Sequence, residues 1–167
     1  AAGSLLGVAL HQGTSFPVGK VEFLNIYPLN FKEFLLASGK GDMVKEMERL
    51  NFPLISNFKN QYIEALKHYY YIGGMPEVVS NYIINKDYQK VRELQKNILI
   101  AYEQDFSKHI SAVLATRLKM LWDSISSQLT KENKKFIYGV IKDGARAKDY
   151  ETALTWLEDC GLVYKIN

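Results

Sequence analysis

From residue 30 onward, apolar side chains recur at the spacing of an α-helix and do not alternate as in a half-buried strand. Near the end of the chain, for example, the positions i, i+3, i+4 and i+7 are filled by Tyr150, Ala153, Leu154 and Leu157. The pattern and the polar breaks within it predict helices at about residues 30–38, 41–50, 56–72, 76–84, 87–109, 111–129, 135–142 and 148–160. The chain is therefore expected to be mainly α-helical.

Two short segments have the composition of strands. Val21–Tyr27 is rich in β-branched and aromatic residues, and Leu162–Ile166 ends the chain in a similar way. Pro28 cannot donate a hydrogen bond to a sheet, so the first strand should stop there. One strand cannot form a stable sheet, so we expect these strands to be left over from an α/β core that lies mostly upstream of residue 1.

Two local signals fix helix ends. Asn30 followed by Glu33 has the spacing of a capping box at the start of the helix at 30–38. Further on, Gly73-Gly74-Met75-Pro76 combines a helix-ending glycine with a proline that is tolerated in the first turn of a new helix. We expect a fixed corner between two helices at Gly73–Pro76.

The last 40 residues predict a helix, a short helix, a turn at Gly144, a longer helix and a strand. This is the order of a winged-helix unit that lacks its wing, and it raises DNA binding as a function. Positive side chains gather here, at Lys131, Lys134, Lys135, Lys142, Arg146 and Lys148, and they favour contact with phosphates. The helix that would enter the major groove carries Asp149, Glu151, Glu158 and Asp159, which repel phosphates. A role in protein contact or in packing is therefore favoured over reading of a DNA sequence.

The composition indicates a folded globular chain, since 47% of its 167 residues are hydrophobic. The formal net charge of +3 is too small to predict a polyanionic partner by itself. A single cysteine, Cys160, allows no internal disulfide, and together with the absence of a membrane-spanning apolar run it predicts a cytoplasmic protein with no membrane partner. The chain starts at Ala1 without a Met, which suggests a piece of something longer.

The motifs of several enzyme classes are missing from the sequence. It contains no phosphate-binding loop G-x-x-x-x-G-K-[ST], and no apolar run ends in the paired acids that would hold magnesium. His11, His68 and His109 have no second ligand at helical spacing, so no metal site is expected. The sequence therefore predicts no catalytic residue in this chain.

Several segments nevertheless resemble a group of bacterial and archaeal AAA-family ATPases that carry a C-terminal domain of unknown function. The resemblance covers essentially the whole chain. It is carried by Ala2-Gly3-Ser4-Leu5-Leu6, Phe16-Pro17-Val18-Gly19-Lys20-Val21-Glu22, Tyr27-Pro28-Leu29-Asn30-Phe31-Lys32-Glu33-Phe34, Gly73-Gly74-Met75-Pro76-Glu77, Tyr102-x-x-Asp105-x-x-Lys108 and Gln128-Leu129-x-x-Glu132-Asn133-Lys134-Lys135-Phe136.

The resemblance implies how the chain is divided and which residues sense nucleotide. Residues 1–38 would be the C-terminal edge of the ATPase core, residues 39–108 a helical lid-like region, and residues 109–167 the start of a C-terminal domain with the winged-helix-like unit. Ser4 would sense the γ-phosphate through its hydroxyl, and Lys20 would bring positive charge near the nucleotide. Relatives often have Arg at the position of Lys20, and Lys lacks the bidentate geometry of Arg.

ATP and Mg²⁺ would bind the parent protein upstream of this chain, so the fragment should not hydrolyse ATP alone. In the parent, the resemblance implies that nucleotide state is coupled to an unknown protein partner. The alternative is a winged-helix module that binds DNA or protein. Apolar residues from Val21 to Leu29, uncovered without the core, also predict self-association into a homo-oligomer.

Overall fold

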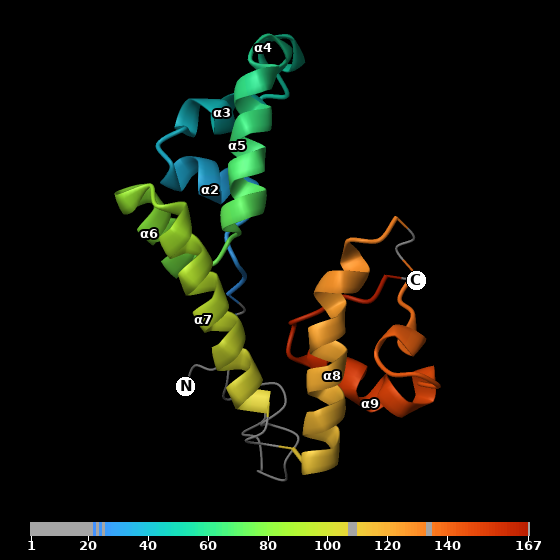
Figure 1. The fold of residues 1–167 in the computed structure, drawn as a ribbon. Coiled ribbons are helices and arrows are strands. Elements are labelled where there is room, and N and C mark those ends of the chain that lie inside the picture. Colours follow the sequence, from blue (N-terminus) through green and yellow to red (C-terminus); the bar gives the residue numbers. More distant parts are fainter. Residues whose placement is uncertain (1–21, 23, 25, 107–109, 133–134, 167) are drawn as a thin grey trace. The chain divides into compact units, whose positions relative to one another are not determined.

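The computed structural model describes residues 22, 24, 26–106, 110–132 and 135–166. All regular secondary structure in these residues is helical (Figure 1), which confirms the prediction of a mainly α-helical chain. Contacts divide the chain into two units. The described residues from 22 to 99 form the N-terminal unit, and those from 100 to 166 form the C-terminal unit. The division falls inside one long helix, α7 (Tyr88–Phe106).

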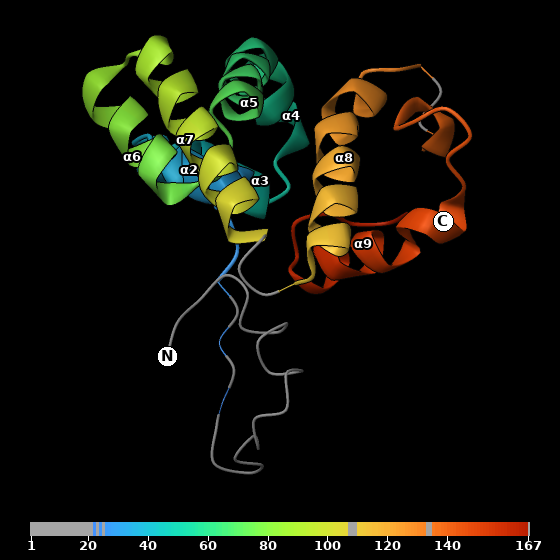
Figure 2. The ribbon, with the colours of Figure 1, turned by 60° about the horizontal axis from the view of Figure 1, so that its bottom comes forward.

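The N-terminal unit is built from short helices around α2. Its elements are α2 (Phe31–Ala37), α3 (Gly41–Glu48), α4 (Phe52–Asn57), α5 (Lys59–Ile72), α6 (Pro76–Asn85) and the first part of α7 (Tyr88–Phe106). Helix α2 contacts α3, α5 and α6, and α6 lies beside α7 (Figure 2). The unit therefore has α2 at its centre.

Two small apolar clusters form the core of the N-terminal unit, one on each side of α2. Phe34 belongs to the first, which also contains Ile72, Val78, Val79, Tyr82 and Val91. Leu35, the next residue, belongs to the second, which also contains Val44 and Ala65. Consecutive residues of a helix point in different directions, so α2 contributes to both clusters.

The C-terminal unit contains the end of α7, helix α8 (Ala112–Leu129), the 3₁₀-helix η1 (Tyr138–Val140) and helix α9 (Ala147–Asp159). Helix α9 crosses α8 in both Figure 1 and Figure 2, and these two helices share the most extensive contact between elements. The core between them is a single cluster rich in aromatic residues: Phe106, Leu118, Leu121, Tyr150, Ala153, Trp156 and Leu157. Phe106 lies edge-on to Trp122 and Trp156, at 5.5 and 5.4 Å between ring centroids.

Two predicted helices differ from the structure. The helix expected at 56–72 is interrupted at Phe58, and the separate helix α4 precedes it because Asn51 accepts a hydrogen bond from the Leu54 amide and Pro53 stands in the first turn. The helix expected at 135–142 is reduced to η1. The amide of Ile137 donates to the side chain of Gln128 at 2.7 Å, which replaces a helical hydrogen bond.

The predicted strands are not found. Of Val21–Tyr27, the described residues 22, 24, 26 and 27 are in no strand, and neither are residues 162–166. A strand needs a neighbour to receive its hydrogen bonds, and no other strand occurs in the described part of the chain. Leu162 and Val163 instead pack on the core of the C-terminal unit, while Tyr164 and Ile166 are exposed. The leftover strands of an α/β core are therefore absent from the residues that the structure describes.

Among the described residues, no helix has both the length and the apolar character that a transmembrane span requires.

Candidate functional site

Leu29, just before α2, is held by the corner between α5 and α6. Its amide donates to the carbonyl oxygen of Gly74 at 2.7 Å, and its carbonyl oxygen accepts from the hydroxyl of Tyr69 at 2.8 Å. Both polar groups of the half-buried Leu29 backbone are thus satisfied by residues 40 or more positions away. We call Leu29, Tyr69 and Gly74 the Leu29 clamp.

The two glycines of the corner are needed for different structural reasons. Gly73 has a φ of 78°, a left-handed conformation that disfavours side chains, and its amide donates to the carbonyl of Tyr69 to end α5. Gly74 is required by close approach, because a Cβ there would lie 2.2 Å from the carbonyl oxygen of Leu29. Met75 is extended and Pro76 begins α6, as the sequence predicts. The fixed corner at Gly73–Pro76 is confirmed.

Aromatic contacts hold Tyr69 in the clamp, and a capped helix end follows Leu29. The Tyr69 ring lies 5.6 Å from the Phe31 ring and 5.5 Å from the Phe34 ring, so α2 holds the tyrosine in place. The predicted capping box at the start of α2 is present: the Asn30 amide donates to the Glu33 carboxylate at 2.8 Å, and the Glu33 amide donates to the Asn30 side chain at 3.0 Å. Leu29 therefore lies directly before a capped helix end.

The end of α5 is also tied to α7. The side-chain amide of Gln95 donates to the carbonyl oxygens of Tyr71 and Ile72, both at 2.9 Å. These carbonyls lie in the last turn of α5 and have no partner within the helix. The corner that holds Leu29 is consequently fixed from the α7 side as well.

The clamp joins two segments that the sequence analysis considered separately, Tyr27–Phe34 and Gly73–Glu77. Sequence reasoning identified both segments but missed that they touch. One signal was available: a helix end needs one left-handed glycine, so the second glycine of the pair indicated that another piece of backbone approaches closely.

The three consecutive tyrosines near the end of α5 lie in three different environments. Tyr69 belongs to the clamp, Tyr70 is exposed, and Tyr71 lies under the guanidinium of Arg92, which is 4.2 Å from its ring centroid. On the same side, the Tyr82 and Tyr88 hydroxyls are 2.9 Å apart. Burial, and then the hydrogen bond with Tyr88, raise the pKa of Tyr82 to about 12, so this phenol stays protonated at neutral pH.

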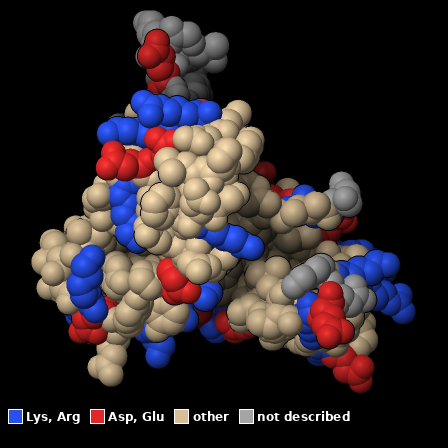
Figure 3. Space-filling model, turned by 90° about the horizontal axis from the view of Figure 1, so that it is seen from above, with Lys and Arg blue, Asp and Glu red and all other residues tan. Residues whose placement is uncertain are grey.

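The residues predicted to sense nucleotide, Ser4 and Lys20, lie outside the described residues, as does Lys134. The other five predicted nucleic-acid contacts lie in the C-terminal unit between the end of α8 and the first turn of α9: Lys131, Lys135, Lys142, Arg146 and Lys148. Lys131 is half-buried and the other four are exposed. Lys and Arg are intermixed with Asp and Glu on the face in Figure 3.

The described part of the chain also shows the surroundings of His68 and Cys160. No group of three potential metal ligands occurs among the described residues, and His68 lies edge-on to Tyr82 and Tyr88, at 6.3 and 6.1 Å between ring centroids. Cys160 is half-buried, and burial, with smaller contributions from Asp159 and Asp105, raises the pKa of its thiol to about 11. The thiol is therefore protonated at neutral pH and is a poor nucleophile.

Comparisons with known proteins add one finding. Residues 63–167 match the family described as "Domain of unknown function (DUF8612)". No curated protein and no solved structure matches the chain. The match begins inside α5 and includes the Gly73–Glu77 segment, whereas Leu29 lies before it.

Proposed function

Because the chain belongs to the DUF8612 family, whose description gives no activity, we propose a function from its own geometry and its resemblance to ATPases. The chain is the C-terminal part of an AAA-family ATP-binding protein, and it transmits the nucleotide state of that protein to a partner. The observation that carries this proposal is the Leu29 clamp. It ties Leu29, in the segment proposed as the C-terminal edge of the ATPase core, to the corner between α5 and α6.

The clamp is suited to transmit a displacement. Leu29 is bonded through both its amide and its carbonyl to the α5–α6 corner, and the next residue caps α2. If residues before Leu29 move when the core changes its nucleotide, α2 and the corner must move with them or the two hydrogen bonds must break. Each such bond contributes only about 1 kcal/mol, so either response is accessible.

ATP and Mg²⁺ do not fit the described residues. The sequence has no phosphate-binding loop, and the described residues present no group of carboxylates that could hold a metal ion. We therefore assign no chemical step to the residues of this chain. The binding and hydrolysis of ATP belong to the core that the resemblance implies. Ser4 and Lys20 remain the proposed nucleotide-sensing residues.

The test compares this chain with the longer protein that includes the ATPase core. We expect ATP to bind and turn over only in the longer protein. In that protein, Gly74→Ala should preserve ATP binding but abolish the nucleotide-dependent change in proteolysis of residues 29–99. Gly41→Ala is the matched control, since an added Cβ there meets only a Leu36 methyl at 3.8 Å.

Two results would contradict the proposal. The first is a longer protein that neither binds nor hydrolyses ATP. The second is a nucleotide response that is identical in the wild type and in Gly74→Ala, because the clamp would then carry no signal.

For the C-terminal unit we favour contact with a protein over contact with DNA. Helix α9, in the place of a recognition helix, exposes Glu151 and Asp159, and these carboxylates would repel phosphates. Binding to duplex DNA, measured by fluorescence anisotropy, should be weak at about 0.15 M salt and unchanged by Lys142→Ala. Tight, salt-dependent binding that Lys142→Ala reduces would reverse this preference.

A further inference from the structure

A groove lies in the N-terminal unit between the end of α5 and the first half of α7. It has a volume of about 380 Å³ and is lined by Tyr71, Tyr88, Gln89, Arg92, Glu93 and Lys96. We call it the α5–α7 groove. Its two tyrosine rings stand perpendicular to each other, at 87° and 5.2 Å between ring centroids, and they are 37% and 38% exposed. The groove therefore presents two aromatic rings to whatever enters it.

The arginine of the groove is held in position by neutral groups. Its guanidinium lies 4.2 Å from the Tyr71 ring centroid, and its Nη1 donates to the side-chain oxygen of Gln95 at 2.9 Å. Gln95 is itself fixed, because it also donates to the end of α5. A guanidinium has five N–H donors, so Arg92 keeps donors for a ligand after bonding to Gln95. A ligand that binds Arg92 does not first have to order the side chain, which lowers the cost of binding.

The α7 side of the groove carries positive charge that is not neutralised. Tyr88, Arg92 and Lys96 recur at every fourth position, so they lie along one face of the helix. Among the described residues, neither Arg92 nor Lys96 has a carboxylate partner. Glu93, the acid in the lining, is paired with Lys90 at 2.8 Å. The groove therefore attracts an anion.

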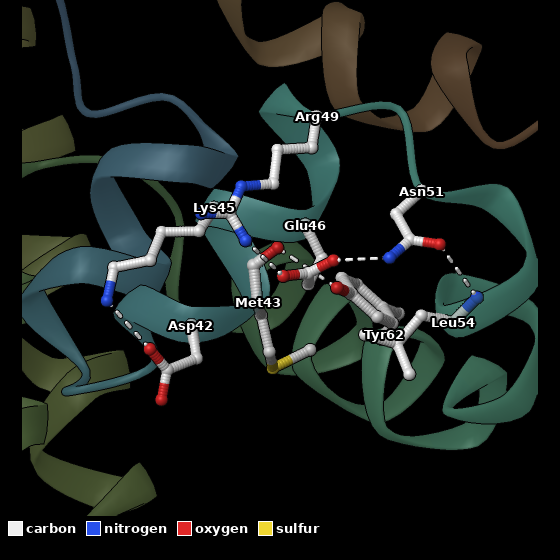
Figure 4. A network of polar contacts seen from close by, with 8 residues as sticks. All are labelled: Asp42, Met43, Lys45, Glu46, Arg49, Asn51, Leu54 and Tyr62. Carbon is white, nitrogen blue, oxygen red and sulfur yellow. Dashed lines mark hydrogen bonds and ion pairs between the residues drawn. The ribbon is translucent and has the colours of Figure 1, made fainter.

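The cations of α3, in the same unit, are in a different situation. Figure 4 shows that Lys45 donates to the Asp42 carboxylate, at 2.9 Å, and that the guanidinium beside the end of α3, that of Arg49, donates to Glu46 at 3.3 Å. Each of these cations has an acid next to it, so it offers an arriving anion less net attraction than Arg92 or Lys96 does.

We propose that the α5–α7 groove binds single-stranded nucleic acid. A base packs against the tyrosine rings, while Arg92 and Lys96 contact the phosphates on either side of it. Aromatic side chains that stack on bases, beside cations that follow the backbone, are the means by which proteins hold single strands without reading their sequence.

The chemistry of the groove disfavours other ligands. A cation is repelled, because Arg92 already covers the Tyr71 ring and the lining is positive. In a duplex the bases are stacked on one another, so the tyrosine rings cannot reach their faces. An acidic peptide pairs with the cations, but its carboxylates make no use of the rings. The inference concerns the N-terminal unit alone and does not depend on an ATPase core.

The test measures binding of this chain to fluorescein-labelled single strands of RNA and of DNA by fluorescence anisotropy, each strand about 12 nucleotides long. At least one of the two should bind, and Arg92→Ala, Lys96→Ala and Tyr88→Leu should each weaken its binding about tenfold. Tyr88→Phe keeps the ring and should bind as the wild type does. In Lys96→Ala, the slope of log affinity against log salt concentration should be less steep by about 0.7, as expected when one phosphate contact is lost.

The matched control is Arg49→Ala, which removes the same charge from the same unit, but from a paired arginine, and should leave binding unchanged. Arg92 and Lys96 are exposed, so their variants should keep the wild-type circular dichroism spectrum and melting temperature.

Four results would overturn the inference. The first is no binding of either strand at about 0.05 M salt. The second is an equal loss in Arg49→Ala and Arg92→Ala, which would reveal a general effect of charge. The third is a duplex of the same length that binds as tightly as the single strands, since its bases cannot reach the rings. The fourth is labelled polyglutamate that binds more tightly than either strand and is unaffected by Tyr88→Leu, which would assign the groove to an acidic protein segment.

Discussion

The two units of the molecule are held together in different ways. In the N-terminal unit, side chains bridge to distant backbone groups: Tyr69 to Leu29, Tyr62 to Met43 at 3.0 Å, and Gln95 to the end of α5. Its buried core is split into two small clusters. The C-terminal unit instead has one aromatic core, shared mainly by α8 and α9.

This difference indicates which unit can change shape. A hydrogen bond contributes about 1 kcal/mol net, so a joint built from a few of them can open without unfolding its surroundings. Removing a large residue from a packed core costs about 2–5 kcal/mol. The C-terminal unit, which is held by such a core, therefore cannot open by breaking one or two weak contacts. We expect the N-terminal unit to respond to a signal and the C-terminal unit to act as a rigid body.

The largest effect is expected in the aromatic core. Leu157 is fully buried there, and Leu157→Ala should lower the free energy of unfolding by about 2–5 kcal/mol. Both tryptophans, Trp122 and Trp156, belong to this unit, so tryptophan fluorescence during urea unfolding reports on it selectively. Thr155→Ala, at an exposed position of α9, should change the same transition by less than about 0.5 kcal/mol.

The next effect tests the clamp. Gly74→Ala places a Cβ against the Leu29 carbonyl and should break both clamp hydrogen bonds, at a cost of about 2 kcal/mol. The loss should appear in the unfolding transition followed by far-ultraviolet circular dichroism, while the transition followed by tryptophan fluorescence stays in place. An equal shift of both signals would show that the units unfold as one, and the contrast between them would be lost.

A smaller effect isolates one hydrogen bond. Tyr69→Phe removes the hydroxyl that donates to Leu29 but keeps the ring against Phe31 and Phe34, so we expect a loss of about 1 kcal/mol. In urea unfolding, Tyr69→Phe combined with Gly74→Ala should cost less than the sum of the two single changes, because both act on the same joint. Strict additivity would mean that the two bonds are independent.

The smallest effect is a pH dependence in the N-terminal unit. Lys45 and Lys67 lower the pKa values of Asp42 and Glu64, so the folded state binds protons less readily than the unfolded state. The stability from these pairs is therefore present above about pH 5 and is lost as the pH falls through the lowered values. Asp42→Asn combined with Glu64→Gln should make the unfolding midpoint fall less between pH 6 and pH 3. An unchanged slope would show that the pairs contribute nothing measurable.

Local features were predictable from the sequence, whereas features that join distant segments were not. The Asn30–Glu33 capping box and the Gly73–Pro76 corner depend on neighbouring residues, and both are present. The clamp depends on the Leu29 backbone reaching Gly74. The second glycine of the pair indicates that some backbone approaches closely, but no pattern in the sequence identifies that backbone as Leu29.

Two of the three errors concern features that depend on another part of the chain, and the third, α4, does not. The Gln128 side chain takes the amide of Ile137 and leaves only η1 where a helix at 135–142 was expected. Helix α4 had a usable local signal, Asn51 two positions before Pro53, which the apolar pattern obscured. The strand composition of Val21–Tyr27 favours a strand only beside another strand, and the described residues offer none.

The most direct test of the central claim is hydrogen exchange at the Leu29 amide in the longer protein that carries the ATPase core. That amide donates to Gly74 and reports whether the clamp is closed. We predict an exchange rate that differs by about tenfold or more between the ATP-bound and nucleotide-free states, with the difference lost in Gly74→Ala. Equal exchange rates in the two states, while residues before Leu29 respond to nucleotide, would contradict coupling through the clamp.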